Sequence, residues 1–279
     1  MSFYVTTVAV ENLDTIPLLA MRWGISALIF VVLILAGIVR VDISKPGFKT
    51  ALITALSQPC LYSIFETNGI AMTSTSESSI MIALIPCVAM IMGSIVFKRK
   101  IKPTIALSIV IAFTGVVIAT VFSPKFSTGG SLIGYLYMAL AVICGGAYAH
   151  LSAKSGQTYT SMETTCIMAI SGGIFFNALN FILGYGTEQY VRCFTDIHIA
   201  GPVVFLGVFC SCVCYLIMNY LTARIDPAGA SNMSASFTTT VGVISGIVLA
   251  GDPWGWYTIL GLVMTLTGVW ITSSAASKQ

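Results

Sequence analysis

Six polar side chains recur at helical spacing inside two apolar stretches of the sequence. They are Gln58, Tyr62 and Glu66 in the first stretch and Ser211, Tyr215 and Asn219 in the second. Residues four apart lie on one face of a helix, so each set predicts a polar stripe. A carboxylate in such a stripe could hold a cationic or amino-bearing group or exchange a proton. The alternative is that these side chains only hydrogen-bond neighbouring helices.

Two further features could carry chemistry. Arg22 lies about one and a half turns inside another apolar stretch. It could extend to lipid headgroups or meet an anionic group of a substrate. Cys210, Cys212 and Cys214 are too closely spaced for a zinc site and have no His nearby, so we expect no metal site.

The apolar stretches are long enough to cross a membrane. Of the 279 residues, 57 % are hydrophobic and 8 % charged, against roughly 25 % charged in an ordinary soluble domain. A membrane helix needs about 20 apolar residues. Nine spans are predicted, at 16–39, 49–71, 77–97, 103–122, 131–151, 162–184, 199–223, 228–250 and 256–274. Pro59 and Pro86 fall within two of them and should kink their helices.

The basic residues indicate which side of the membrane each loop occupies. Ten of the thirteen fall on one side when crossings are counted: Arg40, Lys45, Lys49, Lys98, Arg99, Lys100, Lys102, Lys154, Arg224 and Lys278. Lys125, Arg192 and Arg22 fall toward the other side. Because cytoplasmic loops are enriched in Lys and Arg, we expect the C-terminus to be cytoplasmic. We also expect the protein to be located in the plasma membrane.

An internal repeat relates the two halves. A shift of 153 positions lays 50–119 on 203–272, with Tyr62 on Tyr215 and Thr114–Val116 on Thr267–Val269. The basic loop at 98–100 then falls on 251–253, which has no basic residue, so equivalent loops should lie on opposite sides. This pattern predicts an all-α polytopic membrane protein built from two inverted five-helix repeats. We expect the repeats over 1–122 and 129–274, with a truncated first helix because 1–10 form only a short apolar stub.

The chain resembles the EamA type of the drug/metabolite transporter superfamily over nearly its whole length. The resemblance is carried by LIP at 84–86, TGVVIA at 114–119, GDP at 251–253 and TGVWI at 267–271, and by Arg22. That arginine matches the one that commonly opens the family's second helix. Arg99 and Thr239 depart from the pattern, in which an acidic residue and a proline are usual at these positions.

The resemblance implies ten helices around a central cavity and a secondary transporter of amino acids, nucleobases, sugars or drug-like compounds. Export or exchange by alternating access is expected, because inverted repeats favour it over a fixed pore. The alternatives are a channel or scaffold and an intramembrane enzyme. An enzyme would need a nucleophile with a base, paired carboxylates or a metal set, and none is evident in the sequence.

The partners follow from that function. We expect a small-molecule substrate, the lipid bilayer and a proton or other cation as coupling ion, with a homodimer as an alternative assembly state. We expect neither a cofactor nor nucleic acid, since no dense mixture of basic and aromatic residues occurs.

Overall fold

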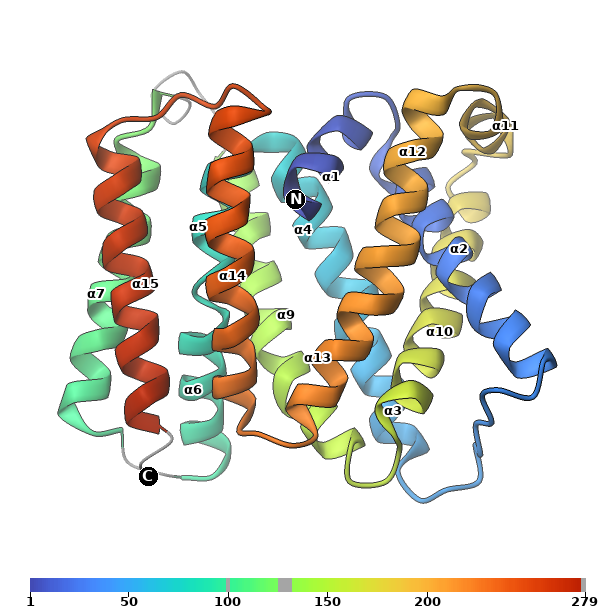
Figure 1. The fold of residues 1–279 in the computed structure, drawn as a ribbon, viewed down its shortest axis with the longest axis horizontal. Helices are drawn as coiled ribbons and strands as arrows, with labels where there is room; N and C mark the ends of the chain where they lie inside the picture. The colour runs from blue at the N-terminus through green and yellow to red at the C-terminus, as the bar shows by residue number, and fades with distance from the viewer. Residues whose placement is uncertain (99–100, 125–131, 277–279) are drawn as a thin grey trace.

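The fold is a bundle of helices that run roughly side by side (Figure 1). The structure is a computed structural model that describes residues 1–98, 101–124 and 132–276. Its helices in chain order are α1 (Ser2–Val10), α2 (Thr15–Leu35), α3 (Phe48–Ala55), η1 (Leu56–Leu61), α4 (Tyr62–Met72), α5 (Thr75–Ile82), α6 (Ile85–Val96), α7 (Pro103–Val121), α9 (Leu132–Ser155), α10 (Ser161–Ile182), α11 (Glu188–Thr195), α12 (Ile197–Phe205), η2 (Leu206–Cys214), α13 (Tyr215–Thr222), α14 (Pro227–Val248) and α15 (Trp256–Ala276).

All nine predicted spans are helical in the described residues, with ends close to those expected. Seven helical segments there are long and apolar enough to cross a membrane. The other two are the run α3–η1–α4 and α14, which extend along the bundle beside the rest (Figure 1). These two carry many polar side chains, and both line the cavity described below. The stub at 1–10 is the nine-residue helix α1, and the polar connection after α10 contains the unexpected short helix α11.

The two halves pack around a two-fold relation. Each of the outer helices α2 and α7 lies along its repeat mate, α10 and α15 respectively (Figure 1). A Cβ at Gly115 would come within 2.7 Å of Gly261 O, and a Cβ at Gly268 within 2.5 Å of Ser108 O. Gly115 and Gly268 are mates under the shift of 153, as are Ser108 and Gly261. The same contact therefore occurs twice with its partners exchanged, as a two-fold interface requires.

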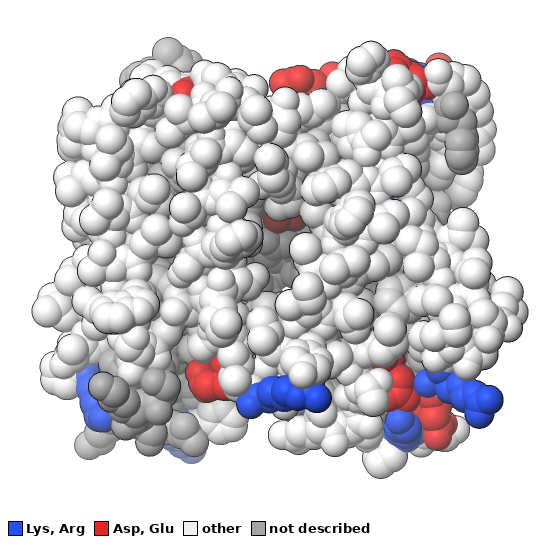
Figure 2. Space-filling model, in the orientation of Figure 1, with Lys and Arg blue, Asp and Glu red and all other residues white. Residues whose placement is uncertain are grey.

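The repeats are inverted. Helix α6 ends at the lower end of the bundle in Figure 1, whereas α14, the mate of α5–α6, ends at the upper end. On the face drawn in Figure 2 the basic side chains gather at the lower end. Arg99, Lys100, Lys125 and Lys278, which entered the charge argument, lie outside the described residues.

Both predicted proline kinks are present. Gln58 has non-helical backbone angles immediately before Pro59, inside the π-helical turn η1. α5 ends before Leu84, and α6 begins with Pro86 in its first turn. The break leaves the last carbonyl groups of α5 without helical partners. The Thr239 hydroxyl, at the repeat mate of Pro86, donates a 3.0 Å hydrogen bond to Ser79 O and satisfies one of them.

Candidate functional site

A cavity of about 190 Å³ lies near the centre of the bundle, between the two repeats. It is lined from α1, α2, the α3–η1–α4 run, the α5–α6 run, α9, the η2–α13 run and α14. Figure 2 shows a hollow in the middle of one face with an acidic side chain at its floor, and Glu66 is the acidic residue of the lining. The cavity therefore opens toward this face.

An ion pair forms the charged part of the cavity. Arg22 on α2 and Glu66 on α4 have 3.9 Å between Nη1 and Oε2, and both residues are largely buried. The Tyr62 hydroxyl donates a 2.9 Å hydrogen bond to Glu66 Oε1. Arg22 Nε donates a 2.8 Å bond to Ser211 Oγ on η2. The lining thus carries one fixed positive and one fixed negative group, and a single ligand could contact both.

The structure removes one sequence-based alternative for Arg22 and changes the interpretation of Glu66. Arg22 does not extend to lipid headgroups, because it is only 4 % exposed and is held by Ser211 and Glu66. Glu66 has a charged partner in the protein itself, Arg22, which comes from a helix more than 40 positions earlier. An isolated charge in a membrane is costly, and pairing offsets part of that cost.

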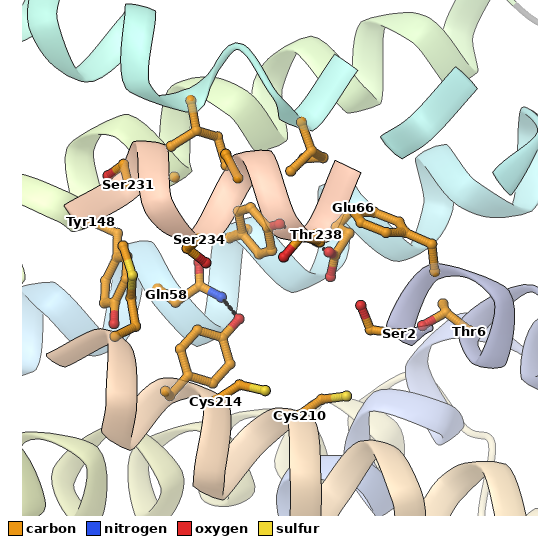
Figure 3. Close-up of a pocket in the computed structure, with 18 of the residues that line it drawn as sticks. Ser2, Thr6, Gln58, Glu66, Tyr148, Cys210, Cys214, Ser231, Ser234 and Thr238 are labelled. Atoms are coloured by element: carbon orange, nitrogen blue, oxygen red, sulfur yellow. Dashed lines mark hydrogen bonds between the residues drawn. The ribbon is translucent and has the colours of Figure 1, made fainter. Parts of the chain in front are cut away.

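The three residues of the second predicted stripe have different surroundings in the structure. Tyr215 reaches the cavity and accepts a hydrogen bond from Gln58 Nε2, shown as the dashed line in Figure 3. Ser211 is fully buried and acts on the cavity through Arg22. Asn219 does not line the cavity. Its side chain accepts from Tyr148 and Ser152 and donates to Thr165, which ties α13 to α9 and α10.

Some lining residues were not predicted. Ser231, Ser234 and Thr238 form a hydroxyl-bearing face of α14 that points toward Gln58 and Glu66 (Figure 3). Their spacing of three and four residues was visible in the sequence, but α14 is rich in Ser and Thr on several faces. Tyr148 on α9 packs edge-on against Tyr215, with ring centroids 6.1 Å apart. Aromatic and hydroxyl groups therefore surround the ion pair.

The described residues contain no group of three or more His, Cys, Asp or Glu side chains placed to hold a metal ion. The close sequence spacing of Cys210, Cys212 and Cys214 does not bring three thiols together. Cys212 turns away from the cavity, where its sulfur contacts Ser26 Oγ at 3.1 Å and Gly207 O at 3.5 Å. Cys210 and Cys214 face the cavity instead (Figure 3).

Comparison with known proteins agrees with this architecture. The model of the EamA-like transporter family matches residues 1–121 and again 132–274. The uncharacterized transporter YcxC of Bacillus subtilis (strain 168) is 29 % identical over 274 residues, covering 96 % of this chain and 87 % of that protein. An uncharacterized transporter of Archaeoglobus fulgidus is 22 % identical and covers 97 % of this chain and 93 % of its own length. A solved crystal structure, 12 % identical, shares the fold with a TM-score of 0.71 over 99 % of this chain and 95 % of its own.

Proposed function

Because the chain belongs to the EamA-like transporter family, and is therefore an integral membrane transporter and not an enzyme, we propose that it is a secondary carrier that works by alternating access. The observation that carries the proposal is the charged cavity between two inverted repeats. Inverted-repeat carriers bind substrate at the repeat interface and expose it to each side in turn. The sequence contains no G-x-x-x-x-G-K-[ST] motif for ATP, which favours a coupling-ion gradient or exchange.

The substrate that best fits the cavity is a small zwitterion such as an amino acid. Arg22 could bind a carboxylate and Glu66 an ammonium group, each with a neighbour that holds its side chain in position. Binding sites for drug-sized ligands enclose about 300–1,000 Å³. The cavity here is smaller, at about 190 Å³, which favours a ligand of few heavy atoms over larger drug-like compounds. Gln58, Tyr215 and the α14 hydroxyls would contact the rest of the ligand.

Glu66 also offers a route for coupling to protons. When the substrate leaves, the carboxylate could pair again with Arg22 or take up a proton. We propose export or exchange across the plasma membrane with the basic end of the bundle in the cytoplasm. A thiol-labelling test of this orientation uses Ser44→Cys at that end and Thr187→Cys at the other, in a background lacking accessible thiols. Labelling of Ser44→Cys from outside would reverse the assignment.

The substrate proposal is tested by transport into vesicles containing the purified protein. The compounds are a small neutral amino acid, the amine that lacks its carboxylate and the acid that lacks its ammonium group. Loss of one charge-assisted hydrogen bond costs about 1.5–3 kcal/mol, or about 10- to 150-fold in affinity. We expect each lone-charge analogue to compete that much more weakly than the amino acid. Equal competition by all three compounds would refute a zwitterion site.

A matched pair of variants tests the role of Glu66 in transport. Glu66→Gln should reduce transport sharply or remove its dependence on pH between about 5 and 8, where a carboxylate exchange step would act. Asn219→Ala removes a buried polar residue outside the cavity, so it should lower stability without changing the ranking of the three compounds. Wild-type transport by Glu66→Gln across that pH range would show that Glu66 is only structural. Steady ionic current in place of saturable counterflow would favour a channel.

A further inference from the structure

Three sulfur-bearing side chains lie at four-residue intervals along the cavity side of one helical run. Cys210 and Cys214 belong to η2 and Met218 to α13, and all three line the cavity. Figure 3 shows the two thiols on the side of the helix that faces Gln58 and Glu66. We call these three residues the sulfur ladder. The transport proposal uses none of them.

The two thiols of the ladder are close to each other. They lie four residues apart on one side of the helix, where side chains are neighbours, and both line the cavity that Arg22 also lines. Cys210 is 8 % exposed, whereas Cys214 is open to the cavity, so a small ion can reach the pair. Neither belongs to a disulfide. By contrast, Cys212, between them in sequence, is buried against α2 and contacts Ser26.

We propose that Cys210 and Cys214 of the sulfur ladder bind a soft monovalent metal ion, Cu(I) or Ag(I), through their two thiolates. Thiolate and thioether sulfur select such ions, whereas imidazole and carboxylate groups suit harder ones. Zinc–sulfur bonds of about 2.3 Å give the scale of such bonds, so an ion that bridges two thiolates keeps their sulfur atoms within roughly 4.6 Å of each other. Neighbouring turns of one helix bring side chains to about this separation.

Metal binding releases protons, and a charged residue already in the cavity offsets the charge of the complex that forms. One M⁺ ion and two thiols give an anionic bis-thiolate complex and two released protons. The complex carries one negative charge, and the Arg22 guanidinium offsets it from α2 across the cavity. Glu66 opposes it but is paired with Arg22 and Tyr62. No oxidation or reduction step is needed when the metal is supplied in the monovalent state.

The test measures metal binding by the purified full chain without any transport substrate. Cu(I), kept reduced, is titrated against a chromogenic Cu(I) chelator of known affinity. We expect each chain to take one Cu(I) ion from the chelator, and this tight binding is the quantity compared among the variants. Cys210→Ser and Cys214→Ser should each lower the affinity for Cu(I) at least about 100-fold. Loss of an outer-shell partner alone costs up to about that factor, and these two residues are the ligands themselves. Met218→Leu should leave the affinity unchanged, because Met218 lies about 12 Å along the helix from Cys210.

Cys212→Ser is the matched control, because it removes a thiol from the same helix that does not face the cavity. It should leave the tight binding unchanged. Equal losses in Cys212→Ser and Cys214→Ser, or retention of tight binding when both cavity thiols are replaced, would overturn the proposal.

A second measurement does not depend on whether the variants fold. X-ray absorption at the copper edge of the wild-type complex should show sulfur-only coordination by two atoms. Nitrogen or oxygen ligands would contradict the assignment. Because both measurements lack transport substrate, the carrier proposal and the metal site can fail independently. If both hold, Cu(I) or Ag(I) should inhibit transport in the wild type and not in Cys214→Ser.

Discussion

Removing one charge of the Arg22–Glu66 pair should destabilise the fold as well as alter transport. Glu66→Gln leaves the Arg22 guanidinium, 4 % exposed, with Ser211 as its remaining hydrogen-bond partner. Breaking a buried pair by removing one partner costs about 3–5 kcal/mol. We expect a loss of about 3 kcal/mol, at the low end, because the bond to Ser211 remains and the cavity admits water.

The assay is a double-mutant cycle on unfolding of the purified protein in detergent. Arg22→Gln, Glu66→Gln and the double variant are compared with the wild type under one set of conditions. The double variant carries no buried charge here, so it should be more stable than the sum of the single losses by about 1–3 kcal/mol. A coupling below about 0.5 kcal/mol is the value expected of independent sites and would refute the ion-pair interpretation. It would leave Glu66 free to act as a carboxylate with no structural partner.

Two further predictions concern stability away from the cavity. Gly115→Ala and Gly268→Ala should each lower the free energy of unfolding by about 1–3 kcal/mol, because each new Cβ would meet the backbone of the mate helix. The two losses should be similar. Gly201→Ala, which has open space around it, should have little effect in the same thermal-unfolding assay. The hydrogen bond from Lys45 Nζ to Glu163 Oε1, 2.7 Å long, raises the pKa of Lys45. The stabilisation that this bond gives the folded protein is therefore complete below the ordinary lysine pKa of about 10.4, and it is lost as the pH rises through the raised pKa of Lys45. Proteolysis of the loop at 36–47 should stay slow from neutral pH to about 10 and accelerate above it.

The helical framework could be predicted almost completely from the sequence, for a physical reason. In a membrane every backbone polar group must be bonded within the protein, so a long apolar stretch has few alternatives to a helix. This made the ends of α7 and α10 predictable within a few residues. Helix α11 was missed because it is short and polar. Its apolar side chains recur on one face, but eight residues give a weak periodic signal.

The site was only partly predictable, because spacing along one helix says nothing about what faces it. The stripe of Gln58, Tyr62 and Glu66 exists, and its internal bond from Tyr62 to Glu66 follows from the four-residue spacing. The partner Arg22 could not be found in this way, since the two charges meet only through packing of α2 against α4. The same limit explains Asn219, whose position in a stripe was correct but whose partners lie on α9 and α10.

Symmetry and asymmetry serve different purposes in this chain. The interface of α7 with α15 uses mate residues in exchanged roles, and such a contact looks the same after the repeats swap conformations. An inverted-repeat carrier needs such a scaffold, because its two end states must have similar energies. The cavity breaks the symmetry, since Glu66 has Asn219 as its mate. Substitutions at the glycine contact should therefore affect both access states alike, whereas substitutions in the cavity should change which ligand is bound.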